Sequence, residues 1–97
     1  MERLGLYEMN DRDKFYSVIN QFDFLVPLWD QEHHKMKIDT FEKRLGTLST
    51  GEQKLAKFMA AVWSHENQYE FDLFNSMTLS TKFFNVIKDW VNNPYWP

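Results

Sequence analysis

The fold is decided by the stretch LSTGEQKLAKFMAAVWSHE, residues 48–66, in which apolar and polar side chains recur at helical spacing. The side chains that share one helical face are Leu55, Phe58, Met59 and Val62. Ser49 precedes Glu52 by three residues, and the two form an S-x-x-E capping box that satisfies the first amides of a helix. We therefore predict a central helix from Thr50 to about Glu66.

The start of this stretch, LSTGEQKL at residues 48–55, also resembles the signature segment of ABC-type ATPases, most closely that of their DNA-repair relatives. In that family a Ser-x-Gly-(Glu/Gln)-Gln run opens a helix and binds the terminal phosphate of a nucleotide, so the resemblance implies ATP binding. That nucleotide is held by a separate GxxxxGKS/T loop, which this chain lacks. We therefore interpret the segment as a helix cap and expect no nucleotide and no other cofactor.

Aromatic residues are frequent, since the 97 residues include 9 Phe, 4 Tyr and 4 Trp, or 18% of the chain. Hydrophobic residues make up 43% and charged residues 26%, which is typical of a globular protein. A chain of this length forms a single small domain, residues 1–97, with one core. Because that interior is small, we expect some of the tryptophans to stay partly exposed at a subunit or partner contact.

The charge and the remaining composition exclude several classes of protein. The formal net charge of −3 gives no general attraction to phosphate backbones, so nucleic acid is a less favoured partner. The absence of cysteine excludes disulfides and thiolate sites. No apolar run has the length of a signal peptide or a membrane span. We therefore expect a cytoplasmic protein that binds no membrane.

Periodicity predicts further helices before the central one. The first runs from about Asp11 to Leu25, and Pro27 ends it. The apolar stripe of this helix consists of Phe15, Val18, Ile19, Phe22 and Val26. Two short helices, at about 28–37 and 40–45, follow, and Gly46 stops the second of them.

Two further elements are predicted after the central helix. Residues 67–77 fit both a strand and a helix, and we favour a helix because no second alternating run offers a strand partner. Ser80 caps the last helix, which ends at Asn92, Asn93 and Pro94. Its buried stripe is predicted to be Phe83, Ile87, Trp90 and Val91. The predicted fold class is all-α, a compact bundle of four to six short helices.

Candidate chemistry is sparse. Asp30 and His34, at i, i+4 spacing, supply two metal ligands on one helical face, and two ligands do not make a site. The carboxylates near His65 belong to Glu66, Glu70 and Asp72, and we interpret them as an acidic surface patch that faces a basic partner. We predict no metal site and no catalytic residues.

A helix pair across Gly46, residues 39–66, has the outline of a helix-turn-helix. Its second helix would present Thr50, Gln53, Lys54 and Lys57 to DNA. The acidic net charge makes this DNA-associated regulator, acting as a dimer, the alternative hypothesis.

The favoured hypothesis is a non-enzymatic protein-binding module, a small regulator or inhibitor that acts through aromatic and acidic surface. Accessory proteins of phages and mobile elements have this profile. Another protein, or a second copy in a homodimer, is the expected partner. The expected contact residues are Trp29, Trp63, Glu66, Glu70, Asp72, Tyr95 and Trp96. Tyr95 and Trp96 belong to a C-terminal tail that either folds back onto the core or offers itself to a partner. The run from Phe71 to Phe74 is expected in the core.

Overall fold

The predicted central helix is confirmed as α3, Thr50–Ser64, in the computed structural model, which describes residues 9–97. Both bonds of the capping box are present: the Glu52 amide donates to Ser49 Oγ at 3.2 Å, and the Ser49 amide donates to Glu52 Oε1 at 3.0 Å. The helix ends two residues before the predicted Glu66, because His65 adopts the left-handed conformation with φ 62°.

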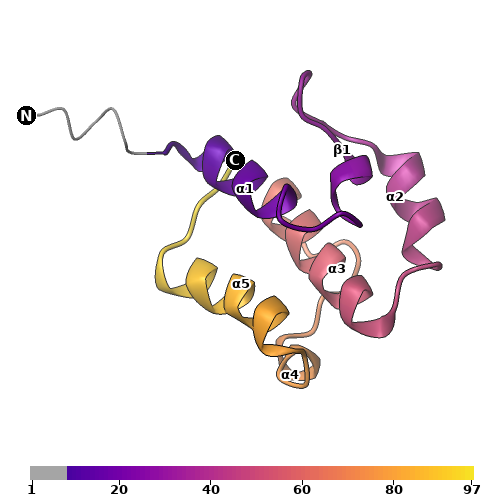
Figure 1. Cartoon of the computed structure of the whole chain (residues 1–97), viewed down its shortest axis with the longest axis vertical. Coiled ribbons are helices and arrows are strands. Elements are labelled where there is room, and N and C mark those ends of the chain that lie inside the picture. The colour runs from indigo at the N-terminus through magenta and orange to yellow at the C-terminus, as the bar shows by residue number, and fades with distance from the viewer. Residues whose placement is uncertain (1–8) are drawn as a thin grey trace, which may run out of the picture.

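The predicted all-α class is confirmed as a mostly helical globule, with five α-helices and one very short β-hairpin among residues 9–97. In Figure 1, α3 lies between α5 on one side and α2 with the hairpin on the other. The other elements are α1 (Asp11–Ile19), the 3-10 helix η2 (Val26–Leu28), β1 (Trp29–Asp30), β2 (Lys35–Met36), α2 (Ile38–Leu45), α4 (Leu73–Ser76) and α5 (Thr81–Asn92).

One core surrounds α3 and is rich in aromatic rings. Phe15 of α1 is fully buried and packs against Trp29 and Trp63, with ring centroids 5.3 and 5.5 Å apart. Trp29 in turn packs edge-on against Phe41 of α2 at 6.1 Å. Edge-to-face packing of this kind stabilises aromatic pairs beyond the burial of their area. On the α5 side, Ile87 completes the core at 1% exposure.

The predicted helix at 28–37 is wrong, because the chain forms the hairpin β1–β2 there, with Trp29 opposite Met36. The extended backbone at Trp29 lets its side chain enter the core, where it is 2% exposed. His34, with φ 55°, supplies a left-handed residue in the reversal between the strands. Burial of one large ring in the core thus prevails over the weak helical periodicity of this segment.

The first helix is also shorter than predicted, since α1 ends at Ile19 and not at Leu25. Tight turns follow, in which Phe22 donates its amide to the carbonyl of Ile19 at 3.2 Å. These turns keep Phe22 and Leu25 buried without a continuous helix. Val26, predicted to be inside, is 40% exposed at the start of η2.

Residues 67–77 form neither a strand nor the favoured long helix, and only the short α4 is helical. Asn67 closes the preceding loop by accepting from the Phe71 amide at 2.7 Å and donating to the Phe71 carbonyl at 2.9 Å. Asp72 then caps α4 through the Phe74 amide at 2.9 Å. In this segment the Asn67 and Asp72 side chains therefore form hydrogen bonds with backbone groups that would pair with one another in a continuous helix.

The predicted last helix is confirmed as α5, with Ser80 as its cap. One member of its predicted stripe is wrong: Val91 is 57% exposed, and Val86, at 9% exposure, is buried instead. The predicted helix at 40–45 is confirmed as α2, which starts earlier, at Ile38. Over residues 9–97, no helix has both the length and the apolar character that crossing a membrane requires.

Candidate functional site

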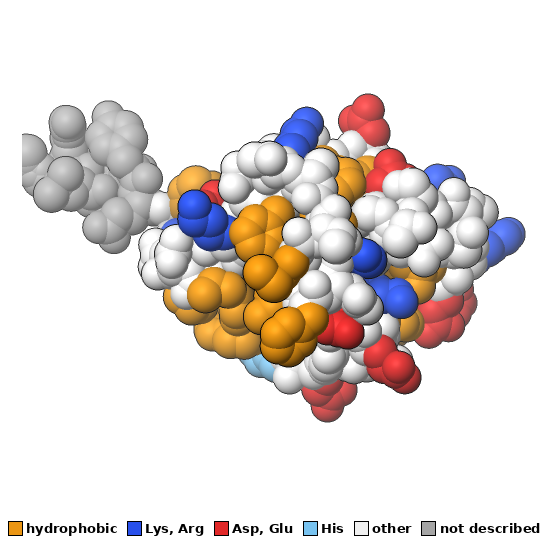
Figure 2. Space-filling model, turned by 90° about the horizontal axis from the view of Figure 1, so that it is seen from below, with side chains coloured by type: hydrophobic (Ala, Val, Ile, Leu, Met, Phe, Trp, Pro, Cys, Tyr) orange, Lys and Arg blue, Asp and Glu red, His pale blue; other side chains and the backbone are white. Residues whose placement is uncertain are grey.

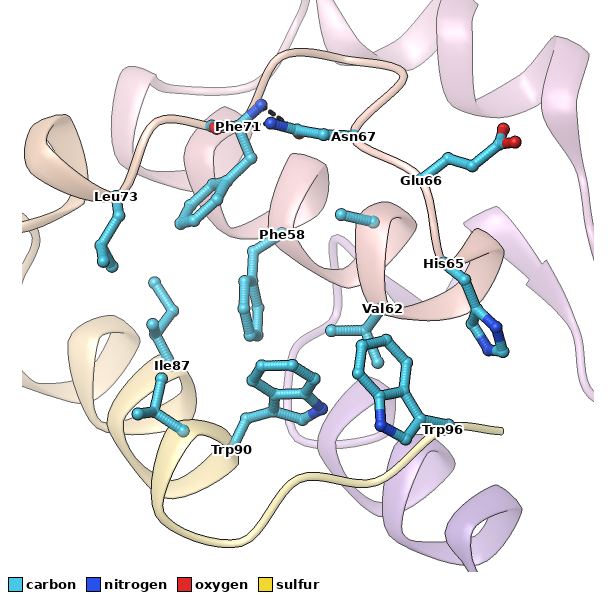
Figure 3. A pocket seen from close by; sticks show the side chains of 12 residues that line it. Phe58, Val62, His65, Glu66, Asn67, Phe71, Leu73, Ile87, Trp90 and Trp96 are labelled. Carbon is cyan, nitrogen blue, oxygen red and sulfur yellow. Dashed lines mark hydrogen bonds between the residues drawn. The ribbon is translucent and has the colours of Figure 1, made fainter.

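An apolar groove lies along α5 and is made of two adjoining hollows, one between α3 and α5 and the other between α4 and α5. The larger, of about 320 Å³, is shown in Figure 3. The smaller, of about 240 Å³, lies further toward α4. Both are lined by Leu73, Ile87 and Val91, so the two hollows form one continuous surface, called the apolar groove below. The other apolar side chains that line it are Phe58, Ala61, Val62, Phe71, Met77, Phe84, Trp90 and Trp96.

Helical spacing explains why these side chains face one another. Phe58 and Val62 are four residues apart on α3, and Phe84, Ile87 and Val91 follow the i, i+3, i+7 pattern on α5. Across the larger hollow, Phe58 of α3 meets Trp90 of α5 edge-on with ring centroids 5.7 Å apart, and Figure 3 shows the two rings side by side.

Tryptophans close one end of the groove in a defined geometry. Trp90 Nε1 donates to the Tyr95 carbonyl at 2.8 Å, which fixes the ring on α5. Trp96 meets Trp90 edge-on with centroids 5.0 Å apart and meets His65 at 4.9 Å. Rigid rings of this kind provide large contact area at low entropic cost.

Large apolar side chains next to the groove reach into solvent. Those most exposed on this side are Leu73 (51%), Phe74 (82%), Met77 (66%), Val91 (57%) and Trp96 (48%). Figure 2 shows hydrophobic side chains gathered on the face seen from below, where α4 lies. Single exposed apolar residues are ordinary in soluble proteins, whereas a contiguous group beside a groove marks an interaction site.

An acidic loop borders the groove and consists of residues 66–72, with Glu66, Glu70 and Asp72 as its carboxylates. Between Lys57 and Lys82 the sequence contains no lysine or arginine. Glu66 lines the larger hollow itself. Glu70 and Asp72 line a different hollow, which Lys54 and Lys57 share, so Glu66 is the carboxylate that the loop presents to the groove.

The predicted contact residues divide into buried and exposed groups. Trp29 and Tyr95 are only 2% and 7% exposed, so the structure places both inside the core and neither offers surface to a partner. Trp96 and Glu66 lie together on the larger hollow of the groove. Trp63 is half-buried and lies in a different hollow, beside His34.

The sequence did not predict that Phe74, the most exposed of these apolar side chains, lies in solvent. The run Phe71–Phe74 was expected in the core, and Phe71 does pack against Phe58 with centroids 5.2 Å apart. Phe74 is 82% exposed instead, because the Asp72 cap turns the chain into α4 and directs this ring outward. Phe71 precedes the Asp72 cap and Phe74 follows it, which is why one ring is packed and the other is exposed. In the sequence, the only sign of this cap is the run Asp-Leu-Phe directly after Phe71.

A separate polar cluster surrounds His34 on the other side of α3. The Tyr16 hydroxyl and His34 Nδ1 are 2.9 Å apart, and the His34 ring lies 4.6 Å from that of Trp63. Burial lowers the pKa of His34, and the Arg12 charge lowers it further. Burial also raises the pKa of Tyr16. The lowered pKa favours a neutral imidazole, which shares one hydrogen bond with the protonated Tyr16 hydroxyl.

Asp30 and His34 do not converge as a pair of metal ligands. Asp30 Oδ2 contacts His33 Nδ1 at 2.8 Å instead, and the hydrogen bonds from His33 lower the pKa of Asp30. Within the part of the chain that the structure describes, no three histidine or carboxylate side chains gather closely enough to hold a metal ion.

Comparison with known proteins finds no family model, no curated protein and no solved structure that matches this chain. The choice of a function therefore depends on the geometry and chemistry of the groove.

Proposed function

We propose that this domain is a protein-binding module and that the apolar groove, with the exposed side chains of α4, is its binding surface. The observation that carries the proposal is the coincidence of two adjoining apolar hollows with five large apolar side chains that are 48 to 82% exposed. Leaving such a surface in water has a cost of about 25 cal/mol per Å² that a bound partner removes. Interfaces are built from such apolar centres with polar rims.

The groove supplies the anchors and the rim that protein interfaces use. Trp90 and Trp96 are held in one geometry by the bond to the Tyr95 carbonyl and by their mutual edge-on contact. Aromatic side chains that are held in place before binding are enriched among the residues that dominate binding energy. The polar residues of the lining are all exposed: His65, Glu66, Asn67, Lys88 and Asn92.

We propose that binding, and not catalysis, is the role of this surface. The titratable groups at the rim, His65 and Glu66, are exposed, whereas acid–base catalysis needs such groups held against a substrate within a pocket. A small domain that only binds acts on its partner as a regulator or inhibitor, by occupying a surface that the partner needs.

The DNA-binding alternative receives less support from the local charges. Lys54 Nζ donates to the Asn75 carbonyl at 3.0 Å, so α4 engages one of the side chains that would read DNA. Lys57 shares a hollow with Glu70 and Asp72. Carboxylates beside the two lysines oppose the approach of phosphates.

The test is affinity capture from a lysate of the native host with three versions of the domain: wild type, Phe74→Ser with Val91→Ser, and Ile38→Ser. Val91 lines the groove and Phe74 follows the lining residue Leu73 on α4, whereas Ile38, 55% exposed, lies on α2. We expect a protein that the wild type and Ile38→Ser retain and that the groove variant loses by at least about ten-fold, as removal of central apolar contacts implies.

All three versions must first show the same thermal unfolding midpoint, which their exposed positions predict. Equal capture by the groove variant and by wild type, for every protein retained, would contradict the proposal. Loss of capture with Ile38→Ser alone would move the binding surface to α2.

A further inference from the structure

We infer that residues 1–8 of this chain bind back into the larger hollow of the apolar groove and cover Trp90 and Trp96 when no partner is bound. The inference rests on the proposed function and concerns the regulation of that same surface, because a segment that occupies the hollow competes with the partner. Its support comes from the place where the described residues begin, the composition of residues 1–8 and the covalent link between the two.

The described residues begin beside the larger hollow. Asn10 caps α1 by accepting from the Asp13 amide at 2.7 Å, which fixes the point where the chain enters this helix. The next residue, Asp11, accepts the Trp96 amide on its Oδ2 at 3.0 Å. Trp96 lines the larger hollow, as Figure 3 shows. Because Met9 is two residues from Asp11, their Cα atoms are at most about 7 Å apart. The chain before Met9 is therefore attached close to this end of the groove.

Residues 1–8, MERLGLYE, supply apolar side chains for such a contact. Met1, Leu4, Leu6 and Tyr7 occupy four of the eight positions, so half of this segment gains from leaving water. Leu4 and Leu6 are two positions apart, which puts both on one face of an extended chain. The larger hollow, of about 320 Å³, has the volume of pockets that enclose small ligands, so it admits side chains of this size.

The covalent link favours this segment over a second copy as the occupant. Eight residues span up to about 28 Å when extended, so residues 1–8 reach the hollow from Met9 without any movement of α1. A short tether of this kind gives an effective concentration of about millimolar at the hollow. A second copy matches it only when the protein itself is that concentrated. A partner must then displace residues 1–8, which lowers its apparent affinity.

The test places a spin label on residue 2 of the full chain and reads the indole N–H signals of the tryptophans by NMR. The sequence contains no cysteine, so Glu2→Cys provides a single attachment point. We expect the label to broaden the signals of Trp90 and Trp96 several-fold more than that of Trp63. Trp63 is the internal control because it lies in a different hollow, beside His34.

The matched control is Glu2→Cys with Leu4→Ser and Leu6→Ser, in which a tether of the same length carries the label without the two leucines. We expect the broadening at Trp90 to fall several-fold in this variant, because the apolar contact is lost. Equal broadening at Trp90 in the two labelled chains would show that attachment near the groove is sufficient, and it would overturn the inference. Broadening at Trp90 that is no greater than at Trp63 would also overturn it.

The other occupants have their own readouts. Spin-labelled Glu2→Cys chain can be mixed with isotope-labelled chain that carries no spin label. Broadening at Trp90 in this mixture would assign the groove to a second copy and overturn the inference. Protection of Trp90 and Trp96 by vesicles of phosphatidylcholine with phosphatidylserine, without broadening by the label in the single chain, would assign the groove to a lipid surface and overturn it as well.

The inference and the proposed function fail separately. If both hold, Leu4→Ser with Leu6→Ser should raise the capture of the partner protein several-fold, because the competing segment no longer occupies the hollow. Capture that depends on Phe74 and Val91, without broadening at Trp90, would overturn the inference and leave the proposed function standing. Broadening at Trp90 without any captured protein that depends on Phe74 and Val91 would support the docking of residues 1–8 and contradict the proposed function.

Discussion

At the scale of single residues, the Tyr95 hydroxyl is buried and has no hydrogen-bond partner among the described residues. Burial raises the pKa of Tyr95 to about 12, and the nearby Asp89 charge acts in the same direction. Burial and the hydrogen bond to Glu42 also raise the pKa of Tyr69 to about 12. Both phenols therefore hold their protons more tightly in the folded state than at the ordinary tyrosine value of about 10.

We predict that stability falls as pH rises from about 10 to 12, because the unfolded chain loses these protons first, and that below pH 10 the shift has no effect. Tyr95→Phe should leave stability at pH 7 within about 0.5 kcal/mol of wild type or raise it, and should reduce the alkaline loss. Urea denaturation at pH 7, 10 and 11.5 measures both effects.

Tyr69→Phe is the matched comparison, since it removes a 2.9 Å bond from the Tyr69 hydroxyl to Glu42 Oε2. It should cost about 0.5 to 1.5 kcal/mol at pH 7. A larger loss for Tyr95→Phe than for Tyr69→Phe would mean that the Tyr95 hydroxyl has a bonding partner.

At the scale of elements, local chemistry and long-range packing compete along the chain. α3 and α5 were predictable because capping residues and an apolar stripe coincide in each. The segment 28–37 has a helical stripe without comparable end signals, and the burial of Trp29 converts it to a hairpin. Where the local signals of a segment are weak, long-range contacts within the chain determine its secondary structure.

We predict that Ser49→Ala destabilises the protein by about 0.5 to 2 kcal/mol, because both bonds of the capping box are lost. Ser80→Ala should have the smaller effect, since its hydroxyl accepts from the Phe83 amide at 3.5 Å, a long contact, and no reciprocal bond accompanies it. The midpoints of urea unfolding at constant slope compare the two. Equal losses would show that the second bond of the box contributes nothing.

At the scale of the whole molecule, the segment 94–97 joins the two ends of the described chain. The Trp96 amide donates to Asp11 Oδ2 at 3.0 Å, across 85 positions of sequence, and Tyr95 is buried against the core. In Figure 1 this segment runs from α5 back to α1. The same segment places Trp96 at one end of the apolar groove, so the stability of the globule and the shape of the groove are coupled.

We predict that deletion of residues 94–97 lowers stability by about 3 kcal/mol or more, the scale for removal of a buried aromatic side chain. Asp11→Ala, which removes the acceptor of the Trp96 amide and one acidic side chain from the first turn of α1, should cost about 1 kcal/mol. Thermal and urea unfolding measure both. An unchanged midpoint after the deletion would mean that Tyr95 does not pack as described.

The sequence alone determined the mostly helical class, the central helix with its capping box, the cap of α5 and the acidic character of residues 66–72. These features depend on neighbours within about one turn of helix, so they can be read from local spacing. Only the tertiary structure decided that Trp29 and Tyr95 are buried, that Phe74 and Val91 are exposed, and that α3 and α5 leave a groove between them. Whether a side chain is buried depends on which distant element covers it, and periodicity within one segment carries no information about that partner.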